Sequence, residues 1–147
     1  MNVLLISTYE LGRQPFGLSS PAAWLRRAGH SVTCLDLSRR KLDVEVVRSA
    51  EFVAFFVPMH TATRLAVAAL PEIRRLNPRA RLCFYGLYAP VNESYLRSLG
   101  AQFILGGEFE EGLIAAVASL AESPSASGEE PAAVSLARQQ FLIPDRA

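Results

Sequence analysis

The apolar residues of this chain form short, almost unbroken runs of Val, Ile, Leu and Phe that alternate with longer segments of helical spacing. A run that is apolar at every position is typical of a strand buried on both faces, as in a parallel sheet covered by helices on both sides. Alternation of such runs with helices predicts βα units joined in one parallel sheet. The five predicted strands cover residues 3–7, 31–36, 52–57, 81–86 and 102–105.

Capping residues mark the helices between these strands. Ser20 before Pro21 predicts the start of the first helix, and Gly29 predicts its end. Asp43 predicts the N-cap of the second helix. The third carries Pro71 in its interior, which predicts a kink or break just before it. Five βα units of this kind predict an α/β fold with a single doubly wound five-stranded parallel sheet, flavodoxin-like or Rossmann-like. The predicted helices are 21–29, 44–49, 62–76, one between 92 and 100, and 110–121, with Leu65, Ala69, Ile73 and Leu76 on the inner face of the third.

Length and composition predict one folded domain followed by a linker and a tail. A chain of 147 residues can bury one core without disulfides or metals. The stretch SPSASGEEP at 123–131 has the composition of a linker, so the domain is predicted to cover 1–122. The tail, 132–147, contains the apolar sequence FLI and is predicted either to pack on the domain or to lead into a further domain.

Charge and cysteine content narrow the class of protein. Fifteen Lys and Arg against fourteen Asp and Glu give a net charge of +1, which predicts no nucleic-acid and no membrane partner. Cys34 and Cys83 lie in apolar runs and are predicted to be buried thiols, which favours a reducing compartment. No apolar run approaches the roughly 20 residues that span a bilayer, and the amino terminus has no signal-peptide pattern. The predicted localisation is cytoplasmic.

The loops at the carboxyl ends of the strands are the predicted binding surface, since ligands of open parallel sheets bind there. The first loop, TYELGRQPFG, lacks G-x-G-x-x-G, and no G-x-x-x-x-G-K-[ST] occurs anywhere, which disfavours dinucleotide and P-loop sites. Receiver chemistry is disfavoured because the required carboxylates are missing after the first and third strands. No hydrolytic triad, paired-carboxylate site or metal cluster of recognised spacing occurs. The sequence therefore favours a binding module over a complete enzyme.

Several residues on these loops have two interpretations. His60 is suited to titrate or to coordinate a ligand, and equally to act as a helix cap or hydrogen-bond donor. Gly86 and the pair at 106–107 would let a ligand approach the backbone, and glycine also suits sharp turns from strand to helix. Aromatic residues on the same loops offer either binding surface or core packing. They are Tyr9, Tyr88 and Phe109.

Four stretches together resemble a known family. They are VLLISTYELGRQPFGLSSPAAWLRRAGHSVTCLDL, FVAFFVPMHTATRLA, NPRARLCFYGLYAP and LGAQFILGGEFEEGL. Over residues 2–121 the chain resembles the cobalamin-binding-type domain that stands before the catalytic barrel in many radical SAM enzymes. The tail sequence FLIPDRA resembles the connector into that barrel, and the whole is most similar to the subgroup of CUAEP/CCAEP-tail radical SAM proteins.

Two family motifs are missing. The C-x-x-x-C-x-x-C that would hold a [4Fe–4S] cluster is absent, so the chain is predicted to carry no iron–sulfur cluster and to be non-catalytic alone, as a fragment of a radical SAM enzyme. The D-x-H-x-x-G that supplies a histidine to cobalt in related domains is also absent. The resemblance thus implies a corrinoid held without the usual histidine ligand. No residue is assigned as a metal ligand, and His60 is placed to approach either the cobalt or a propionamide of the corrinoid.

The resemblance implies cobalamin as the cofactor and the radical SAM catalytic domain as a partner. The alternative is a degenerate domain that no longer binds cobalamin and docks a catalytic domain, a substrate or a partner subunit. A third hypothesis is a free-standing binder of a flavin or nucleotide. The cofactor-binding residues implied are Thr8, Tyr9, Gly17, Met59, His60, Thr61, Gly86, Tyr88, Gly106 and Gly107.

Overall fold

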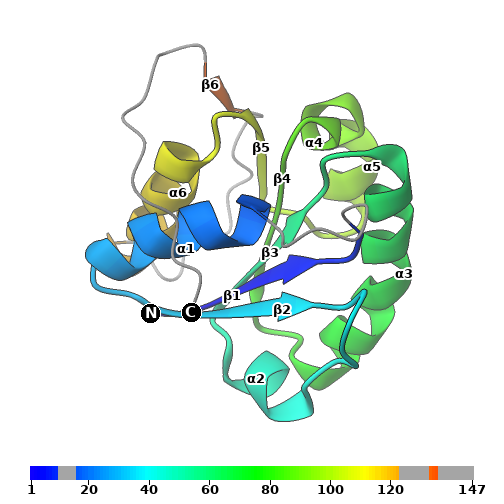
Figure 1. Ribbon diagram of the computed structural model, residues 1–147, viewed down its shortest axis with the longest axis horizontal. Coiled ribbons are helices and arrows are strands. Elements are labelled where there is room, and N and C mark those ends of the chain that lie inside the picture. Colours follow the sequence, from blue (N-terminus) through cyan, green and yellow to red (C-terminus); the bar gives the residue numbers. More distant parts are fainter. Residues whose placement is uncertain (10–15, 123–132, 136–147) are drawn as a thin grey trace.

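A parallel sheet runs through the middle of the molecule, with its strands in the order β2-β1-β3-β4-β5-β6 (Figure 1). The structure is a computed structural model, and it describes residues 1–9, 16–122 and 133–135. Every pair of neighbouring strands is parallel. The elements are β1 (Asn2–Ser7), α1 (Phe16–Arg27), β2 (Ser31–Asp36), α2 (Val44–Ser49), β3 (Phe52–Phe56), α3 (His60–Leu76), β4 (Arg81–Tyr85), α4 (Tyr88–Val91), α5 (Glu93–Ser98), β5 (Phe103–Gly107), α6 (Glu110–Glu122) and β6 (Ala133–Ser135).

The order of the first five strands confirms the predicted flavodoxin-like, doubly wound fold. The strand order reverses between β1 and β3, so the carboxyl ends of these two strands mark the switch point of the sheet. The sixth strand, β6, comes from the predicted tail and pairs with the outer edge of β5, where Gly107 lies opposite Ser135. The predicted linker and residues 136–147 lie outside the described residues, and the domain boundary at 122 stays a prediction.

Two apolar cores hold the helices against the sheet. On one face α3, α4 and α5 cover the strands, and Phe55 stacks on Phe84 with ring centroids 5.3 Å apart. On the other face α1 and α6 pack side by side, with Leu25 and Val117 fully buried (Figure 1). Because side chains alternate along a strand, β1 sends Leu4 to the first core and neighbouring residues to the second. The sheet is therefore buried on both faces.

The inner face of α3 differs from the prediction. The helix begins at His60, and its buried side chains include Ala62 and Ala66, whereas Leu65 is 44% exposed. The small alanine side chains let the helix lie close to the sheet, a packing effect that hydrophobicity alone does not reveal. The predicted break before Pro71 is wrong, because α3 continues through it as one helix. Pro71 is exposed, so water can donate a hydrogen bond to the helix carbonyl that lacks an N–H partner because of this proline.

The two cysteines differ in exposure. Cys83 is fully buried in β4, as predicted, and burial raises the pKa of its thiol. The prediction that Cys34 is buried is wrong: it is exposed, because β2 is the edge strand and part of its surface is uncovered. We expect iodoacetamide to modify Cys34 and to spare Cys83 in the native protein, since only an accessible thiolate reacts. Mass spectrometry of peptides would count the labels.

Unfolding in urea before alkylation is the control, and it should yield label on both thiols. Equal labelling of Cys83 and Cys34 in the native protein would contradict the packing of β4.

Candidate functional site

Buried polar side chains gather at the carboxyl edge of the sheet. They come from the end of β1, the first half of α1 and the first turns of α3 and α6, which all meet at that edge. The rest of the described core is mostly apolar, although Nε1 of Trp24 and Nη2 of Arg97 are also buried without a hydrogen-bond partner among the described residues. The buried polar residues are Ser7, Thr8, Ser19, Ser20, Thr63 and Glu110.

The end of β1 carries one satisfied hydroxyl and one unsatisfied hydroxyl. Thr8 is 4% exposed, and its Oγ1 donates to the carbonyl of Ala62 at 2.8 Å, which fixes β1 to the first turn of α3. Ser7 is fully buried, and its Oγ has no hydrogen-bond partner among the residues that the structure describes. A buried polar atom without a partner costs about 1–3 kcal/mol, and such atoms occur where a ligand or water completes the site.

Ser20 links α1 to α6. The predicted role of Ser20 as an N-cap is wrong, because α1 begins at Phe16 and Ser20 lies inside the helix. Its Oγ donates instead to Oε1 of Glu110 at 2.9 Å. Glu110 is only 3% exposed and lies in the first turn of α6, where the positive end of the helix stabilises a carboxylate. This buried pair places an acidic group beneath the carboxyl edge.

Pro21 explains a second polar contact of α1. A proline has no backbone N–H, so the carbonyl of Gly17, four residues earlier, loses its helical partner. The hydroxyl of Tyr85 donates to that carbonyl at 2.7 Å. The end of β4 is thereby fixed to the first turn of α1. No local pattern in the sequence reveals this long-range replacement.

Three aromatic rings fill the space between the ends of β3 and β4 and the start of α6. Tyr85 and Phe109 have ring centroids 4.7 Å apart, and Phe56 lies 5.4 Å from Tyr85 and 5.7 Å from Phe109. Phe109, one of the predicted rim aromatics, therefore packs within this cluster. Tyr9 is partly buried, whereas Tyr88 is 38% exposed.

Two of the predicted glycines are required by internal packing. A Cβ at Gly17 would lie 2.2 Å from the ring of Phe56, and a Cβ at Gly86 would lie 3.0 Å from the carbonyl oxygen of Val57. Gly86 also has a φ of +117°, which disfavours any other residue. These glycines let α1 and the β4–α4 turn approach β3 closely.

The remaining glycines of the rim are Gly106 and Gly107 at the end of β5. Their backbones pair with β6, and Gly107 has a φ of 56° and is exposed.

Met59, His60 and Thr61 form the turn from β3 into α3. The carbonyl of Met59 accepts hydrogen bonds from the N–H and the hydroxyl of Thr63, at 3.1 and 3.0 Å. The side chain of Met59 makes no capping hydrogen bond, and His60 and Thr61 are exposed. Their side chains are thus available at the switch point between β1 and β3. Thr8 lies beside them through its contact with α3.

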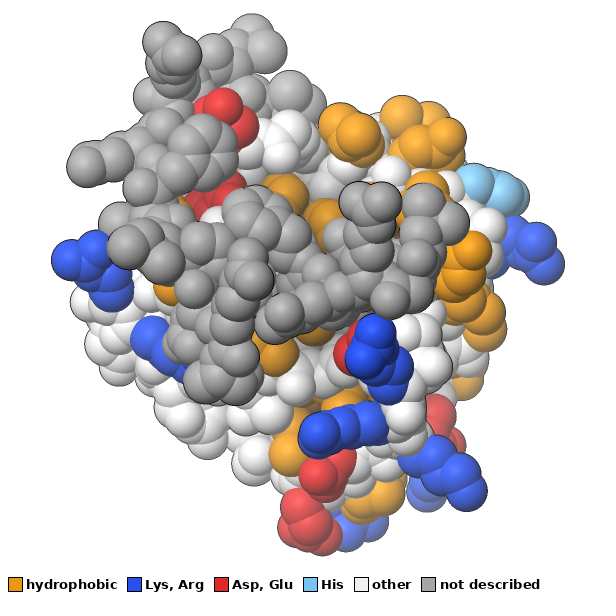
Figure 2. Space-filling view, in the orientation of Figure 1, with side chains coloured by type: hydrophobic (Ala, Val, Ile, Leu, Met, Phe, Trp, Pro, Cys, Tyr) orange, Lys and Arg blue, Asp and Glu red, His pale blue; other side chains and the backbone are white. Residues whose placement is uncertain are grey.

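An exposed apolar surface lies next to this turn. Figure 2 shows hydrophobic side chains gathered over α4 and along α3. We call the part formed by Leu87, Tyr88, Val91 and Tyr95 the α4–α5 apolar surface. Leu87 is 69% exposed and Val91 is 77% exposed. The N–H of Tyr88 donates to the carbonyl of Val57 at 3.1 Å, which fixes this surface to the end of β3.

The structure brings most of the predicted residues to one edge but in two groups. Thr8, Met59, His60 and Thr61 meet at the switch point, whereas the predicted glycines lie along the ends of β4 and β5 and in α1. Sequence reasoning missed Ser7 and the Ser20–Glu110 pair, because their importance depends on burial and on contacts across the chain.

In the described ranges no three His, Cys, Asp or Glu side chains come together in a group that could hold a metal ion. No helix of the described part has the length and apolarity to cross a membrane.

Comparison with known proteins gives a likeness of fold. No protein-family model matches this sequence, and no curated protein matches it. Among solved structures, the chain is similar to the radical S-adenosylmethionine methyltransferase TsrM from Kitasatospora setae, solved with its tryptophan substrate and the SAM analogue aza-SAM. The TM-score is 0.67 at 20% sequence identity, over 82% of this chain. The chain spans 26% of the TsrM chain, so its fold is similar to that of one part of a much longer methyltransferase.

Proposed function

We propose that this chain is the cobalamin-binding-type accessory domain of a radical SAM enzyme and that it holds a corrinoid at the carboxyl edge of the sheet. The observation that carries the proposal is the fully buried hydroxyl of Ser7 at that edge, which has no hydrogen-bond partner in the described part of the chain. The sequence resemblance and the fold likeness to part of a radical SAM methyltransferase support the same class of protein. The assignment to the CUAEP/CCAEP-tail subgroup belongs to this proposal, and FLIPDRA, which suggests it, lies outside the described residues.

The residues of the edge fit a corrinoid in part. Its amide side chains and nucleotide need hydrogen-bonding partners, and the Ser7 hydroxyl and the exposed Thr61 and His60 side chains provide them. The glycines fit less well, because the ring of Phe56 already fills the space beside Gly17 and the carbonyl of Val57 fills the space beside Gly86. The corrinoid therefore has its proposed contacts at the switch point rather than over these glycines.

A bound corrinoid would supply a cobalt centre for methyl transfer or radical control. The chain's own part is to bind and orient it. Ser7 would complete its hydrogen bonding with the ligand, and Thr61 and His60 would contact the ligand's polar periphery. Thr8 would hold the end of β1 against the first turn of α3. The reaction itself would depend on a catalytic domain, since this sequence has no iron–sulfur motif.

Hydroxocobalamin added to the purified protein should show a shifted absorption spectrum and should stay with the protein through gel filtration. Ser7→Ala should weaken binding about five- to tenfold, the effect of one neutral hydrogen bond. The same substitution should raise the melting temperature of the protein without ligand, because it removes an unsatisfied buried hydroxyl. Opposite effects on binding and stability distinguish a binding hydroxyl from a structural one.

Ser119→Ala is the matched control, since the Ser119 hydroxyl donates to the carbonyl of Ala116 within α6. It should leave corrinoid binding unchanged. Loss of all colour on gel filtration at about 50 μM wild-type protein, a concentration at which a micromolar affinity gives near-saturation, would refute corrinoid binding.

The second candidate function is docking without a cofactor, and the α4–α5 apolar surface favours it. Exposed contiguous apolar side chains mark interaction surfaces in many proteins. If the wild-type protein retains no corrinoid, docking becomes the better-supported of the two functions.

A further inference from the structure

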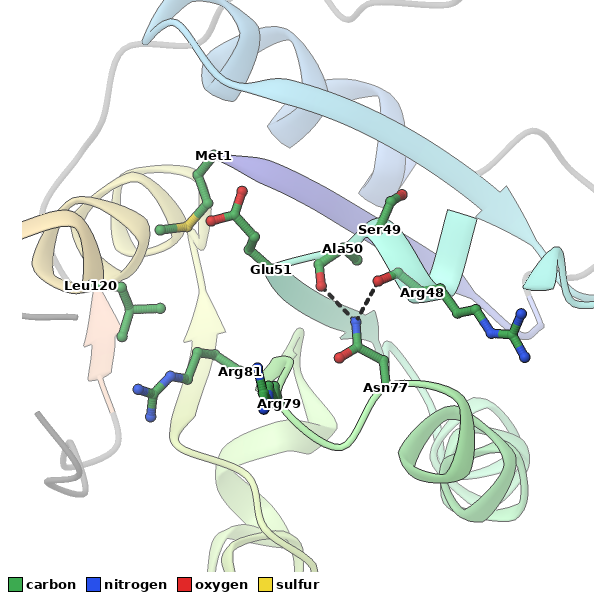
Figure 3. A pocket seen from close by; sticks show the side chains of 9 residues that line it. All are labelled: Met1, Arg48, Ser49, Ala50, Glu51, Asn77, Arg79, Arg81 and Leu120. Atoms are coloured by element: carbon green, nitrogen blue, oxygen red, sulfur yellow. Dashed lines mark hydrogen bonds between the residues drawn. The ribbon is translucent and has the colours of Figure 1, made fainter. Parts of the chain in front are cut away.

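A pocket opens at the amino-terminal edge of the sheet, opposite the proposed corrinoid site. It has a volume of about 360 Å³ and lies between the α2–β3 loop and the α3–β4 loop, with Met1 and Leu120 beside it (Figure 3). Small-molecule sites have volumes of about 300–1,000 Å³. α3 runs from one edge to the other, and its 17 residues at about 1.5 Å each separate the two sites by about 25 Å. The pocket is therefore independent of the carboxyl edge.

The α3–β4 loop is held firmly by groups on both sides. Nδ2 of Asn77 donates to the carbonyls of Ala50 at 2.7 Å and Val47 at 2.8 Å, and its Oδ1 accepts from the N–H of Ala80 at 3.1 Å (Figure 3). Arg74 donates to the carbonyl of Ala80 at 3.1 Å. These bonds fix the backbone on either side of Arg79 without using the Arg79 side chain. The loop thus holds the backbone of Arg79 in place at the pocket and leaves its side chain exposed.

The charges around the pocket favour an anion. Figure 3 shows Arg79 and Arg81 on the same side of the pocket, while the Arg48 guanidinium points away. Arg79 is exposed and makes no hydrogen bond or ion pair with the described residues. Glu51 is the one acidic residue of the lining, and its Oε1 already accepts from the N–H of Asn2 at 3.0 Å. Arg79 therefore offers the pocket a positive charge that no described residue pairs with.

We propose that this pocket binds a small organic anion that has one carboxylate or phosphate group and an apolar body. The planar guanidinium of Arg79 matches either oxyanion through paired hydrogen bonds. The side chains of Met1 and Leu120 give the apolar body a surface to pack on. This second site gives the domain a ligand other than the proposed corrinoid.

Amide NMR titration of the whole chain with phenyl phosphate, benzoate and inorganic phosphate tests the proposal. Saturable shifts are expected at 48–51 and 77–81, and not at 106–111. Comparison of phenyl phosphate with benzoate identifies the preferred oxyanion. Inorganic phosphate should bind at least about fivefold more weakly than phenyl phosphate, because it has no apolar body.

Arg79→Ala should weaken binding about tenfold or more, as expected for a hydrogen-bonded charge. Arg64→Ala is the matched control. Arg64 is exposed near the start of α3, at the opposite end of that helix from the pocket, and its substitution should leave binding unchanged. Absence of saturation by any of the three anions at 10 mM, equal affinity for inorganic and phenyl phosphate, or equal effects of the two substitutions would overturn the proposal. None of these outcomes bears on corrinoid binding, which is measured at the other edge.

Discussion

Gly17→Ala should lower the free energy of unfolding by about 2–3 kcal/mol, although alanine is the better helix former. The gain in helix propensity is about 1 kcal/mol, but the new Cβ would lie 2.2–2.4 Å from three carbons of the Phe56 ring. That ring is held between Tyr85 and Phe109 and has little room to move. Urea denaturation followed by circular dichroism would measure the loss.

The Phe56→Ala background provides the control for this prediction. Phe56→Ala removes the ring and should itself cost about 3–5 kcal/mol. In that background Gly17→Ala should become neutral or stabilising, because the clash is gone and the helix propensity remains. A destabilisation of the same size in both backgrounds would show that Phe56 is not the cause.

Tyr85→Phe should lower the free energy of unfolding by about 2 kcal/mol. The substitution keeps the ring in the aromatic cluster and removes only the hydroxyl that donates to the carbonyl of Gly17. Tyr85 is fully buried, so the carbonyl loses its partner and water does not readily replace it. Thermal unfolding of the variant beside the wild type would measure the effect.

Pro21→Ala restores the backbone N–H that the helix lacks at this position. With alanine there, the carbonyl of Gly17 regains its partner four residues later, and Tyr85→Phe should cost less than about 1 kcal/mol. If the cost is the same with proline and with alanine, the hydroxyl does not compensate for Pro21.

The strands of this fold were predictable because a strand buried on both faces leaves a direct hydrophobic signature. All five predicted strands exist within one or two residues of their predicted ends, and Asp43 caps α2 as predicted. Helix starts were harder. Ser20 has the chemistry of an N-cap, but a buried carboxylate ninety residues later is its partner, and no local pattern encodes that contact.

The candidate site could be located by topology but not described in detail. The rule for parallel sheets predicts a site at the carboxyl edge, and His60 and Thr61 lie exposed at that edge. The interpretation of glycines from sequence left open whether a ligand or the protein occupies the space beside them. At Gly17 and Gly86 the protein occupies it, and only the positions of Phe56 and Val57 reveal this. Ser7 was missed because an unsatisfied hydroxyl is a property of burial.

The pairing of β6 with β5 covers part of the outer edge of β5. An uncovered edge strand offers a row of free N–H and C=O groups to any other extended chain, and proteins commonly shield such edges. β6 covers the outer side of β5 from Leu105 to Gly107, where two glycines provide no side chains to hinder a foreign strand. The backbone groups of β5 at these positions are thus already paired within the chain and are not offered to an extended segment of another molecule.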